Sequence, residues 1–304
     1  MTSRRVLKPR PGEGGQPGSL ELGEGARLDP APGEVAVDIT AALLDPLALV
    51  ATEGEARSSA GFCGLVAEVG PSAAEHLRVG QVVVGTGPLA DAVTVPESDL
   101  DALPPNSRLS AKQAATIPYL ASIERALAGF PIKPGSRVIV AGRPALRRLT
   151  AQLLTASCPD ASITGLGLRA SQETESDGRF DALIHALGDP AELDSALSAL
   201  RHDGEALLLV PPGRQVLALD FYPHVHRSCV RMVARRVEAQ ARTATGRDAG
   251  YSRLARLLRQ RRLDVEAAPF EAWDPADQRE LRLAGIARAG KLLTVSWRAE
   301  PAPV

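Results

Sequence analysis

Residues 137–147 read RVIVAGRPALR, and they give the strongest indication of the fold class. Four apolar residues precede Gly142, which is the pattern of a buried strand that ends in a tight turn. Pro144 stands where a helix begins, because proline fits the first helical turn and has no N–H to lose there. Apolar side chains then share one helical face, at Leu146, Leu149, Leu153 and Leu154. Together these features predict one strand–turn–helix unit of a parallel α/β sheet.

The same alternation continues toward the C-terminus. Strands are predicted over residues 161–168, 180–185 and 205–210, helices over 191–200 and 251–263, and a closing strand over 291–297. This order predicts a doubly wound parallel sheet covered by helices. The arginine-rich stretch 227–262 is predicted to form the solvated face of helices and a loop. An anion or nucleic-acid patch is the competing interpretation.

The first 105 residues have a different character. Residues 34–39 alternate apolar and polar side chains, and residues 65–70, 79–85 and 90–96 are similar, with glycines typical of turns beside them. Residues 9–25 are rich in glycine and proline and predict a surface loop between two short strands. Short strands with glycine turns predict a partly open β-barrel. From Ser110, a residue typical of helix N-caps, a helix is predicted through residue 127.

Composition narrows the class of protein. The chain has 304 residues, which predicts two domains, and its formal net charge of −1 and 3% aromatic content argue against a nucleic-acid partner. No apolar run approaches the roughly 20 residues that cross a bilayer, and no apolar segment follows the basic N-terminus as in a secretory signal. Cys63, Cys158 and Cys229 are far apart, which suits reduced thiols and gives no zinc-ligand spacing. We therefore expect a cytoplasmic protein with a small-molecule substrate and no membrane partner.

Short motifs along most of the chain add a resemblance. They are PGEV at 32–35, AALLDP at 41–46, GLVAEVG at 64–70, LRVGQVV at 77–83, AATIP at 114–118, KPG at 133–135 and GKLL at 290–293. In order and spacing they resemble the medium-chain dehydrogenase/reductase superfamily, particularly its zinc-independent quinone- and enoyl-reductase-like branch. A weaker resemblance, to the bacteriochlorophyllide dehydrogenase-like subgroup, comes from the short segment 168–180 and from residues 188–194 and 221–227.

The resemblance implies a fold and an assembly. The α/β fold would combine a GroES-like, partly open β-barrel domain over residues 1–122 and 266–304 with a Rossmann-like doubly wound domain over residues 123–265. Relatives often dimerise through sheet edges, so a homodimer is implied as well. Zinc-dependent members carry a cysteine and a GHE triplet where this chain has Leu44-Asp45 and Ala60-Gly61. Because zinc needs a cluster of such ligands, we expect no zinc site.

The nucleotide motif is altered. Relatives that bind NAD(P) carry GxGxxG, whose glycines form the turn, admit the pyrophosphate and let the helix pack on the strand. The aligned residues are Gly142, Arg143, Pro144, Ala145, Leu146 and Arg147. Pro144 removes an N–H donor, and Arg147 brings a long side chain to a close-packed position. Arg143 and Arg147 could still meet a phosphate directly at the helix N-terminus. NADP(H) binding in a changed pose and no dinucleotide binding both stay open.

Three further residues are assigned to the cofactor by the resemblance. Arg169 stands near the position where NAD-specific members have an acid, and an arginine there favours the 2′-phosphate of NADP. A solvated surface arginine is the alternative. Leu187 and Pro211, just beyond the third and fourth predicted strands, complete the set of cofactor-binding candidates.

Four residues are candidates for catalysis. Asp45 could orient a substrate or transfer a proton, or it could cap the turn before Pro46. Tyr119 and Ser122, near the domain junction, could donate a proton to a developing oxyanion, or could serve packing alone. His185 ends the third α/β strand, at the edge where this fold class binds ligands, or is a hydrogen-bonded structural histidine.

Three hypotheses for function follow. The first is a zinc-free reductase or dehydrogenase that transfers hydride between NADP(H) and an enone, quinone or alcohol/ketone. The second is a non-redox descendant, such as a cyclase, dehydratase or isomerase, that uses the four candidate residues in acid–base roles. The third is a pseudoenzyme or scaffold that has lost dinucleotide binding. The altered residues Pro144 and Arg147 distinguish the first hypothesis from the other two.

Overall fold

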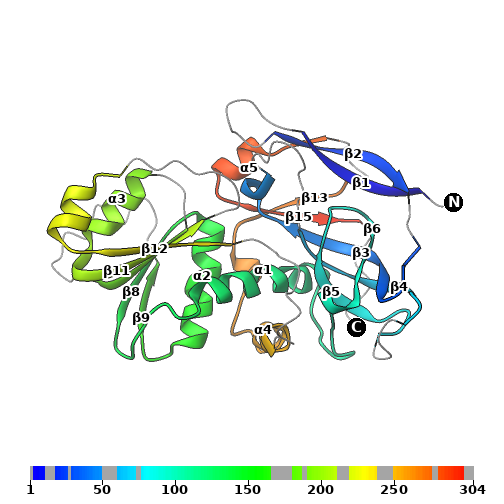
Figure 1. Ribbon diagram of the computed structural model, residues 1–304, viewed down its shortest axis with the longest axis horizontal. Helices are drawn as coiled ribbons and strands as arrows, with labels where there is room; N and C mark the ends of the chain where they lie inside the picture. Colours follow the sequence, from blue (N-terminus) through cyan, green and yellow to red (C-terminus); the bar gives the residue numbers. More distant parts are fainter. Residues whose placement is uncertain are drawn as a thin grey trace.

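The computed structural model describes residues 3–10, 18–26, 29–49, 60–72, 77–165, 180–186, 190–210, 219–237, 249–275 and 280–297. Within these residues the chain forms an α/β half and a β-rich half, and helix α1 (Ala111–Leu127) lies between them (Figure 1). No helix in the described part is long and apolar enough to span a membrane.

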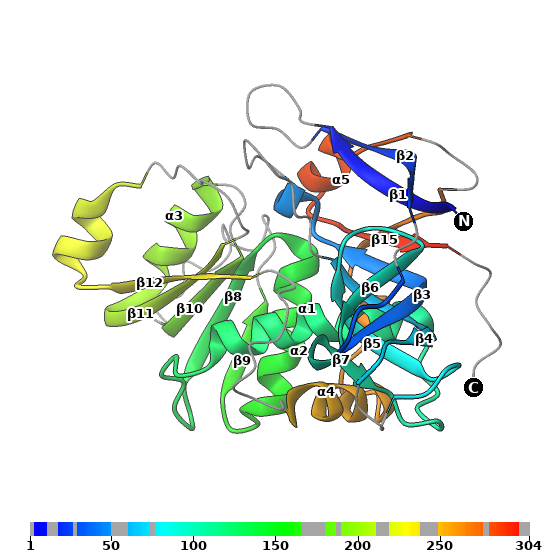
Figure 2. The ribbon, with the colours of Figure 1, turned by 45° about the vertical axis from the view of Figure 1, so that its right-hand side comes forward.

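The α/β half contains a five-stranded parallel sheet. Its strands are β8 (Arg137–Gly142), β9 (Ser162–Gly165), β10 (Phe180–Ala186), β11 (Leu200–Val210) and β12 (Arg231–Arg236). They lie in the order β12-β11-β10-β8-β9, and every neighbouring pair is parallel (Figure 2). This order confirms the predicted doubly wound parallel sheet.

Helices cover both faces of this sheet. Val138 and Val140 point toward α2 (Pro144–Ser157), whose leucines share their hydrophobic cluster. Ile139 and Ala141, the alternate residues of β8, belong to a second cluster that includes α3 (Pro190–Ser198). Because successive side chains of a strand point to opposite faces, β8 is buried on both sides. This explains why its sequence is an unbroken apolar run.

The prediction for residues 227–262 is wrong in part. Residues Arg231–Arg236 form β12, which pairs in parallel with β11 at the edge of the sheet. A π-helical turn, η5 (Tyr222–Arg227), precedes it, and α4 (Ala249–Arg259) follows in the described part. An edge strand gains its backbone hydrogen bonds from one neighbour and is exposed elsewhere, so its arginines conceal the strand pattern.

The β-rich half contains a seven-stranded sheet in the order β13-β15-β3-β4-β5-β7, with β6 paired to β3. Its strands are β3 (Glu34–Leu44), β4 (Ala60–Val69), β5 (Val82–Gly87), β6 (Ala92–Pro96), β7 (Leu100–Ala102), β13 (Phe270–Trp273) and β15 (Leu292–Ser296). A smaller sheet is formed by β1 (Ser3–Arg10), β2 (Ser19–Ala26) and β14 (Glu280–Arg282). Short helices join these strands: η2 (Pro46–Leu49), η3 (Glu97–Asp99), η6 (Val265–Ala267) and α5 (Ala284–Arg288).

The loop predicted over residues 9–25 is wrong at both ends. β1 and β2 pair antiparallel along their full lengths, from Ser3 opposite Ala26 to Arg10 opposite Ser19. The glycines in β2 serve close packing: a Cβ on Gly25 would lie 2.8 Å from Cγ2 of Val6. Glycine in a strand can mark close approach as well as a turn, which explains the error.

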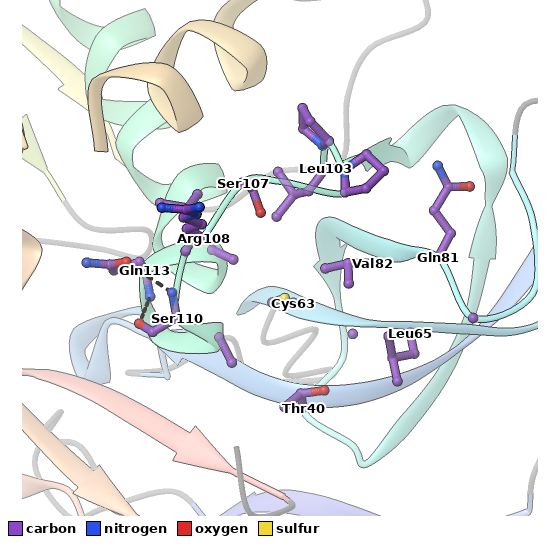
Figure 3. A pocket seen from close by; sticks show the side chains of 17 residues that line it. Thr40, Cys63, Leu65, Gln81, Val82, Leu103, Ser107, Arg108, Ser110 and Gln113 are labelled. Carbon is purple, nitrogen blue, oxygen red and sulfur yellow. Dashed lines mark hydrogen bonds between the residues drawn. The ribbon is translucent and has the colours of Figure 1, made fainter. Parts of the chain in front are cut away.

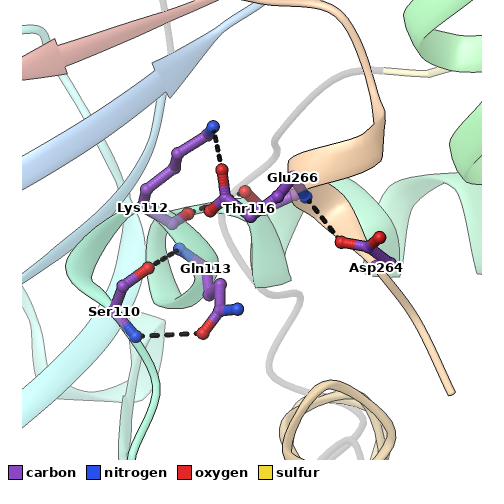
Figure 4. A network of polar contacts seen from close by, with 6 residues as sticks. All are labelled: Ser110, Lys112, Gln113, Thr116, Asp264 and Glu266. Atoms are coloured by element: carbon purple, nitrogen blue, oxygen red, sulfur yellow. Dashed lines mark hydrogen bonds and ion pairs between the residues drawn. The ribbon is translucent and has the colours of Figure 1, made fainter. Parts of the chain in front are cut away.

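Helix α1 begins with a capping box. The Ser110 hydroxyl accepts from the Gln113 N–H at 3.2 Å, and Gln113 Oε1 accepts from the Ser110 N–H at 3.0 Å (Figure 4). Lys112 forms an ion pair with Glu266 at 2.5 Å, and its ammonium lies 4.4 Å from the centre of the Phe270 ring. These contacts tie the start of α1 to the segment that enters β13. The helix therefore has a defined position between the two halves.

Candidate functional site

Three side chains from distant parts of the chain meet where the two halves join. Asp45 follows β3, Tyr119 lies within α1, and Arg143 occupies the turn after β8. Arg143 donates two hydrogen bonds to the Asp45 carboxylate, Nη1 to Oδ1 and Nη2 to Oδ2, each at 2.8 Å. The Tyr119 hydroxyl donates to Oδ2 at 3.0 Å. We call these three residues the Asp45 cluster; their exposed fractions are 3%, 7% and 2% for Asp45, Arg143 and Tyr119.

Local sequence explains the position of each member. The Leu47 N–H donates to Asp45 Oδ1 at 3.0 Å, so Asp45 caps the turn at Pro46 as one sequence interpretation expects, and it also forms the ion pair. Arg143 is the N-cap residue of α2; its guanidinium has only donors, so it cannot cap the helix, and it reaches Asp45 instead. Bidentate pairing of this kind uses the planar fork of arginine, which lysine lacks.

The charges of the Asp45 cluster are held in one state. Burial alone would raise the pKa of the Asp45 carboxyl, but the Arg143 charge and hydrogen bonds outweigh it and hold that pKa below its ordinary value. Burial, and then the charge of Asp45, raises the pKa of the Tyr119 phenol well above 10.0. The pKa of Arg143 is raised by Asp45 despite burial. At neutral pH the cluster therefore contains a carboxylate, a guanidinium and a neutral phenol.

The backbone N–H groups around the turn after β8 already have acceptors. The Gly142 N–H donates to Glu192 Oε1 at 3.1 Å, and the Arg143 N–H donates to the Ala186 carbonyl at 3.0 Å. Pro144 has no N–H. The Ala145 N–H donates to the Gly290 carbonyl at 3.2 Å. Three donors that a phosphate could use at this helix start, the N–H groups of Gly142, Arg143 and Ala145, are thus used within the protein.

The other predicted cofactor residues are placed as follows. Leu146 is 1% exposed and packs in the core with α1 and β8. Arg147 is half-buried, and its Nη1 lies 3.9 Å from Oε1 of Glu192, a residue that is itself 8% exposed. Arg169, Leu187 and Pro211 lie outside the described residues.

These residues do not fit the pyrophosphate of a dinucleotide in the usual pose. Such a site offers free N–H groups and room at the helix start. Here three of the N–H groups are bonded, Arg143 is held by Asp45, and the Glu192 carboxylate lies at the same turn, where it would repel a phosphate. Only the first glycine of the motif keeps its role, which is to form the tight turn after the strand. Gly142 has a φ of 94° and no space for a side chain.

Ser122 and His185 form no side-chain hydrogen bond to the charged groups of the Asp45 cluster. The Ser122 hydroxyl donates to the Tyr119 carbonyl at 2.7 Å, within helix α1. His185 is 0% exposed on β10, and neither ring nitrogen has a hydrogen-bond partner among the described residues. Burial lowers the pKa of His185 from 6.5 to about 4, so the ring is neutral at pH 7. The structure thus groups Asp45, Tyr119 and Arg143, with Ser122 beside them, and leaves His185 apart.

His185 should make folding sensitive to mild acid. Because its folded-state pKa of about 4 is below its ordinary value of 6.5, the unfolded state binds more protons between these limits. Between pH 7 and 4.5, we expect this residue alone to lower the free energy of unfolding by about 2–3 kcal/mol. Urea denaturation of the wild type and His185→Leu should therefore show a smaller loss for the variant. Equal losses would refute the assignment; Asp45 does not interfere above pH 4.5, because its contribution begins to be lost only as the pH falls to its ordinary pKa of 3.8.

Three side chains that can ligate a metal lie together outside the Asp45 cluster. In the described part of the chain, His202, Asp203 and Cys229 have ligand atoms within 4.8 Å of one another, and all three are exposed. His202 Nδ1 lies 3.1 Å from Asp203 Oδ2. The Asp45 cluster contains one carboxylate and neither cysteine nor histidine, so it does not supply a zinc ligand set.

Glu192 and the pairing of Asp45 with Arg143 were not predicted. Glu192 belongs to α3, 50 residues from Gly142, and no local pattern indicates the contact. The pairing left no such signal, because Arg143 aligns with a variable position of the GxGxxG pattern, whose altered positions are Pro144 and Arg147.

Comparison with known proteins supports the fold. The chain matches no family model, and no curated protein matches its sequence. Solved structures do match. 2R,3R-butanediol dehydrogenase from Bacillus subtilis has a TM-score of 0.70 and 14% identity over 98% of this chain and 100% of that one. The CurK enoyl reductase has a TM-score of 0.67 and 16% identity over 96% of this chain and 99% of that one.

A third match is a dehydrogenase from Sinorhizobium meliloti 1021, which is described as zinc-binding and whose structure contains NADP. It has a TM-score of 0.71 and 14% identity over 98% of this chain and 100% of that chain. Each similarity extends over both halves described above. This chain therefore has the fold of the medium-chain dehydrogenase/reductase superfamily along nearly its whole length.

Proposed function

We propose that this protein binds a small molecule without a nicotinamide dinucleotide, as a non-redox user of the medium-chain fold. One observation carries the proposal: Arg143, in the turn where a pyrophosphate would lie, is buried in a bidentate ion pair with Asp45. The pair connects the two halves at the place where a dinucleotide would otherwise bridge them. A cavity of about 420 Å³ in the β-rich half supports the binding role.

The free energies of the contacts involved favour the Asp45–Arg143 ion pair over a contact between Arg143 and a phosphate. Removing one partner of a buried pair costs about 3–5 kcal/mol, since it leaves an uncompensated charge. Two hydrogen bonds from Arg143 to a phosphate would offset much of that cost, at about 1.5–3 kcal/mol each. The N–H groups of Gly142 and Ala145 would also have to leave their present acceptors. The balance therefore opposes dinucleotide binding.

The same contacts weigh against acid–base catalysis by the predicted residues. The Asp45 carboxylate already accepts bonds from Arg143, Tyr119 and the Leu47 N–H, and its lowered pKa makes it a weak base. The raised pKa of Tyr119 makes it a weak acid. A binding role is therefore better supported than a cyclase, dehydratase or isomerase role that uses these groups.

A second candidate function is an oxidoreductase that transfers hydride between NADP(H) and an enone, quinone or alcohol/ketone. The fold favours it, because the matched structures are dehydrogenases and a reductase, one of them bound to NADP. Gly142 also retains the tight turn that such a site uses. In this alternative Arg143 leaves Asp45 and binds a phosphate.

Titration with NADPH and, separately, NADH distinguishes the two candidates. We expect calorimetry to detect no binding of either nucleotide up to millimolar concentration, because the donors at the turn after β8 are used. A dinucleotide-binding dehydrogenase of the same fold, titrated alongside, controls for the assay. Micromolar binding of NADPH that is lost in Arg143→Met would overturn the proposal and support the oxidoreductase.

A further inference from the structure

A cavity of about 420 Å³ lies in the β-rich half, away from the Asp45 cluster. Strands β3, β4 and β5 form one side of it, and residues 103–114, which lead into α1, form the other (Figure 3). None of its lining residues belongs to the turn after β8 or to the Asp45 cluster. Its volume falls in the range of about 300–1,000 Å³ that small-molecule sites occupy.

The inner wall of the cavity is apolar. Leu65, Val82 and Leu103 line it, and the thiol of Cys63 lies among them (Figure 3). Cys63 is 5% exposed, and burial raises the pKa of its thiol to about 12, so the group stays protonated. A buried neutral thiol behaves as a small apolar group. This wall suits a hydrocarbon or aromatic body.

Two side-chain hydroxyls at the cavity have no hydrogen-bond partner among the described residues. Thr40, which lines it from β3, is 8% exposed, and its hydroxyl forms no hydrogen bond to any described residue. Because a hydroxyl can both donate and accept a hydrogen bond, this group is suited to bind a ligand oxygen or a water. The half-buried Ser107, on the opposite side, also has no side-chain hydrogen bond within the described residues.

The charge at the cavity has one sign. Arg108 is the sole charged residue among the 17 that line it, and none of them is an acid. Arg108 is exposed, and its guanidinium makes no ion pair or hydrogen bond within the described part of the chain. The cavity therefore combines an apolar wall with one available positive charge at its side.

We propose that this cavity binds an amphipathic monoanion, a carboxylate with an apolar body, with the carboxylate at Arg108. The apolar body contacts Cys63, Leu65, Val82 and Leu103, and the burial of that surface supplies most of the affinity. Arg108 selects the anion over a neutral compound of equal shape. This inference rests on the small-molecule-binding role proposed above and names its ligand class and place.

Calorimetric titration with decanoate, and with decan-1-ol as its uncharged counterpart, tests the inference. We expect one decanoate per chain and weaker binding of the alcohol. Arg108→Gln should weaken decanoate binding about fivefold, the size expected of an exposed ion pair, and leave the alcohol unaffected. Arg78→Gln is the matched control, because Arg78 is an exposed arginine of the same half outside the cavity lining.

A second variant tests whether the apolar body of the ligand lies inside the cavity. Leu65 is partly exposed, so Leu65→Trp can fill the cavity from its wall, and it should abolish binding of both compounds while the melting temperature shows that the protein folds. If Leu65→Trp does not fold, the Arg108→Gln comparison still decides. Failure of decanoate to bind, or binding that neither variant changes, would overturn the inference.

Together, the NADPH and decanoate titrations distinguish a failure of this inference from a failure of the proposed function. NADPH binding in the same preparation would reject the non-dinucleotide role, and decanoate binding sensitive to Arg108→Gln would still establish the cavity ligand. If neither NADPH nor decanoate binds, the proposed ligand class is rejected and the non-dinucleotide role stays in place. Equal affinity for decanoate and decan-1-ol would refute the role of Arg108.

Discussion

Arg143→Met is expected to lower the free energy of unfolding by about 3–5 kcal/mol at pH 7. The substitution removes the counter-charge of Asp45, which is 3% exposed and keeps its ionised form because of Arg143. A carboxylate left alone in a low-dielectric interior must pay its full desolvation cost or take up a proton. Urea denaturation of the wild type and the variant measures the difference.

Two further variants identify the cause. Asp45→Leu combined with Arg143→Met should lose less stability than Arg143→Met alone, because it buries no unpaired charge. Arg201→Met removes one partner of an ion pair whose side chains are 54% and 33% exposed, and it should change stability by less than about 1 kcal/mol. An Arg143→Met protein as stable as the Arg201→Met protein would contradict the assigned role of the Asp45 cluster.

Gly142→Ala is expected to cost more than about 4 kcal/mol or to prevent folding. Gly142 has φ of 94°, a conformation that L-residues rarely adopt, and an added Cβ would lie 1.9 Å from the Ala186 carbonyl oxygen. That oxygen also accepts from the Arg143 N–H, so it cannot move without loss of a hydrogen bond at the start of α2. Circular dichroism and the melting temperature measure the effect.

Gly165→Ala is the matched control for this prediction. Gly165 ends the neighbouring strand β9, has no left-handed φ, and offers open space to an added Cβ. We expect Gly165→Ala to change stability by less than about 1 kcal/mol. A Gly142→Ala protein that melts near the wild-type temperature would show that the turn tolerates a side chain.

Most of the fold could be predicted because its signals are local. The apolar run before Gly142, the leucines of α2 and the N-cap at Ser110 each act over a few residues, and the structure contains the strand and the helices they predict. The errors arose where one residue type serves two roles. Gly25 indicated a turn and instead permits close strand packing, and arginines on β12 concealed an edge strand.

The candidate site was predictable only as a set of residues. Asp45, Tyr119 and Arg143 were all singled out, but with roles taken from a resemblance in which a cofactor lies among them. Their contacts are with one another, across 74 and 98 residues of chain. Helix α1 and the turn after β8 must both be in place before the guanidinium can reach the carboxylate.

An α/β protein with a β-rich half and a parallel sheet could be predicted from residue patterns alone, because periodicity, caps and turns are local properties. The altered glycine motif is likewise visible in the sequence. What replaces that motif depends on the folded structure. The Asp45–Arg143 pair, the Glu192 contact to Gly142 and the cavity beside Arg108 each depend on segments brought together by packing, and neither pattern nor composition reports such distances.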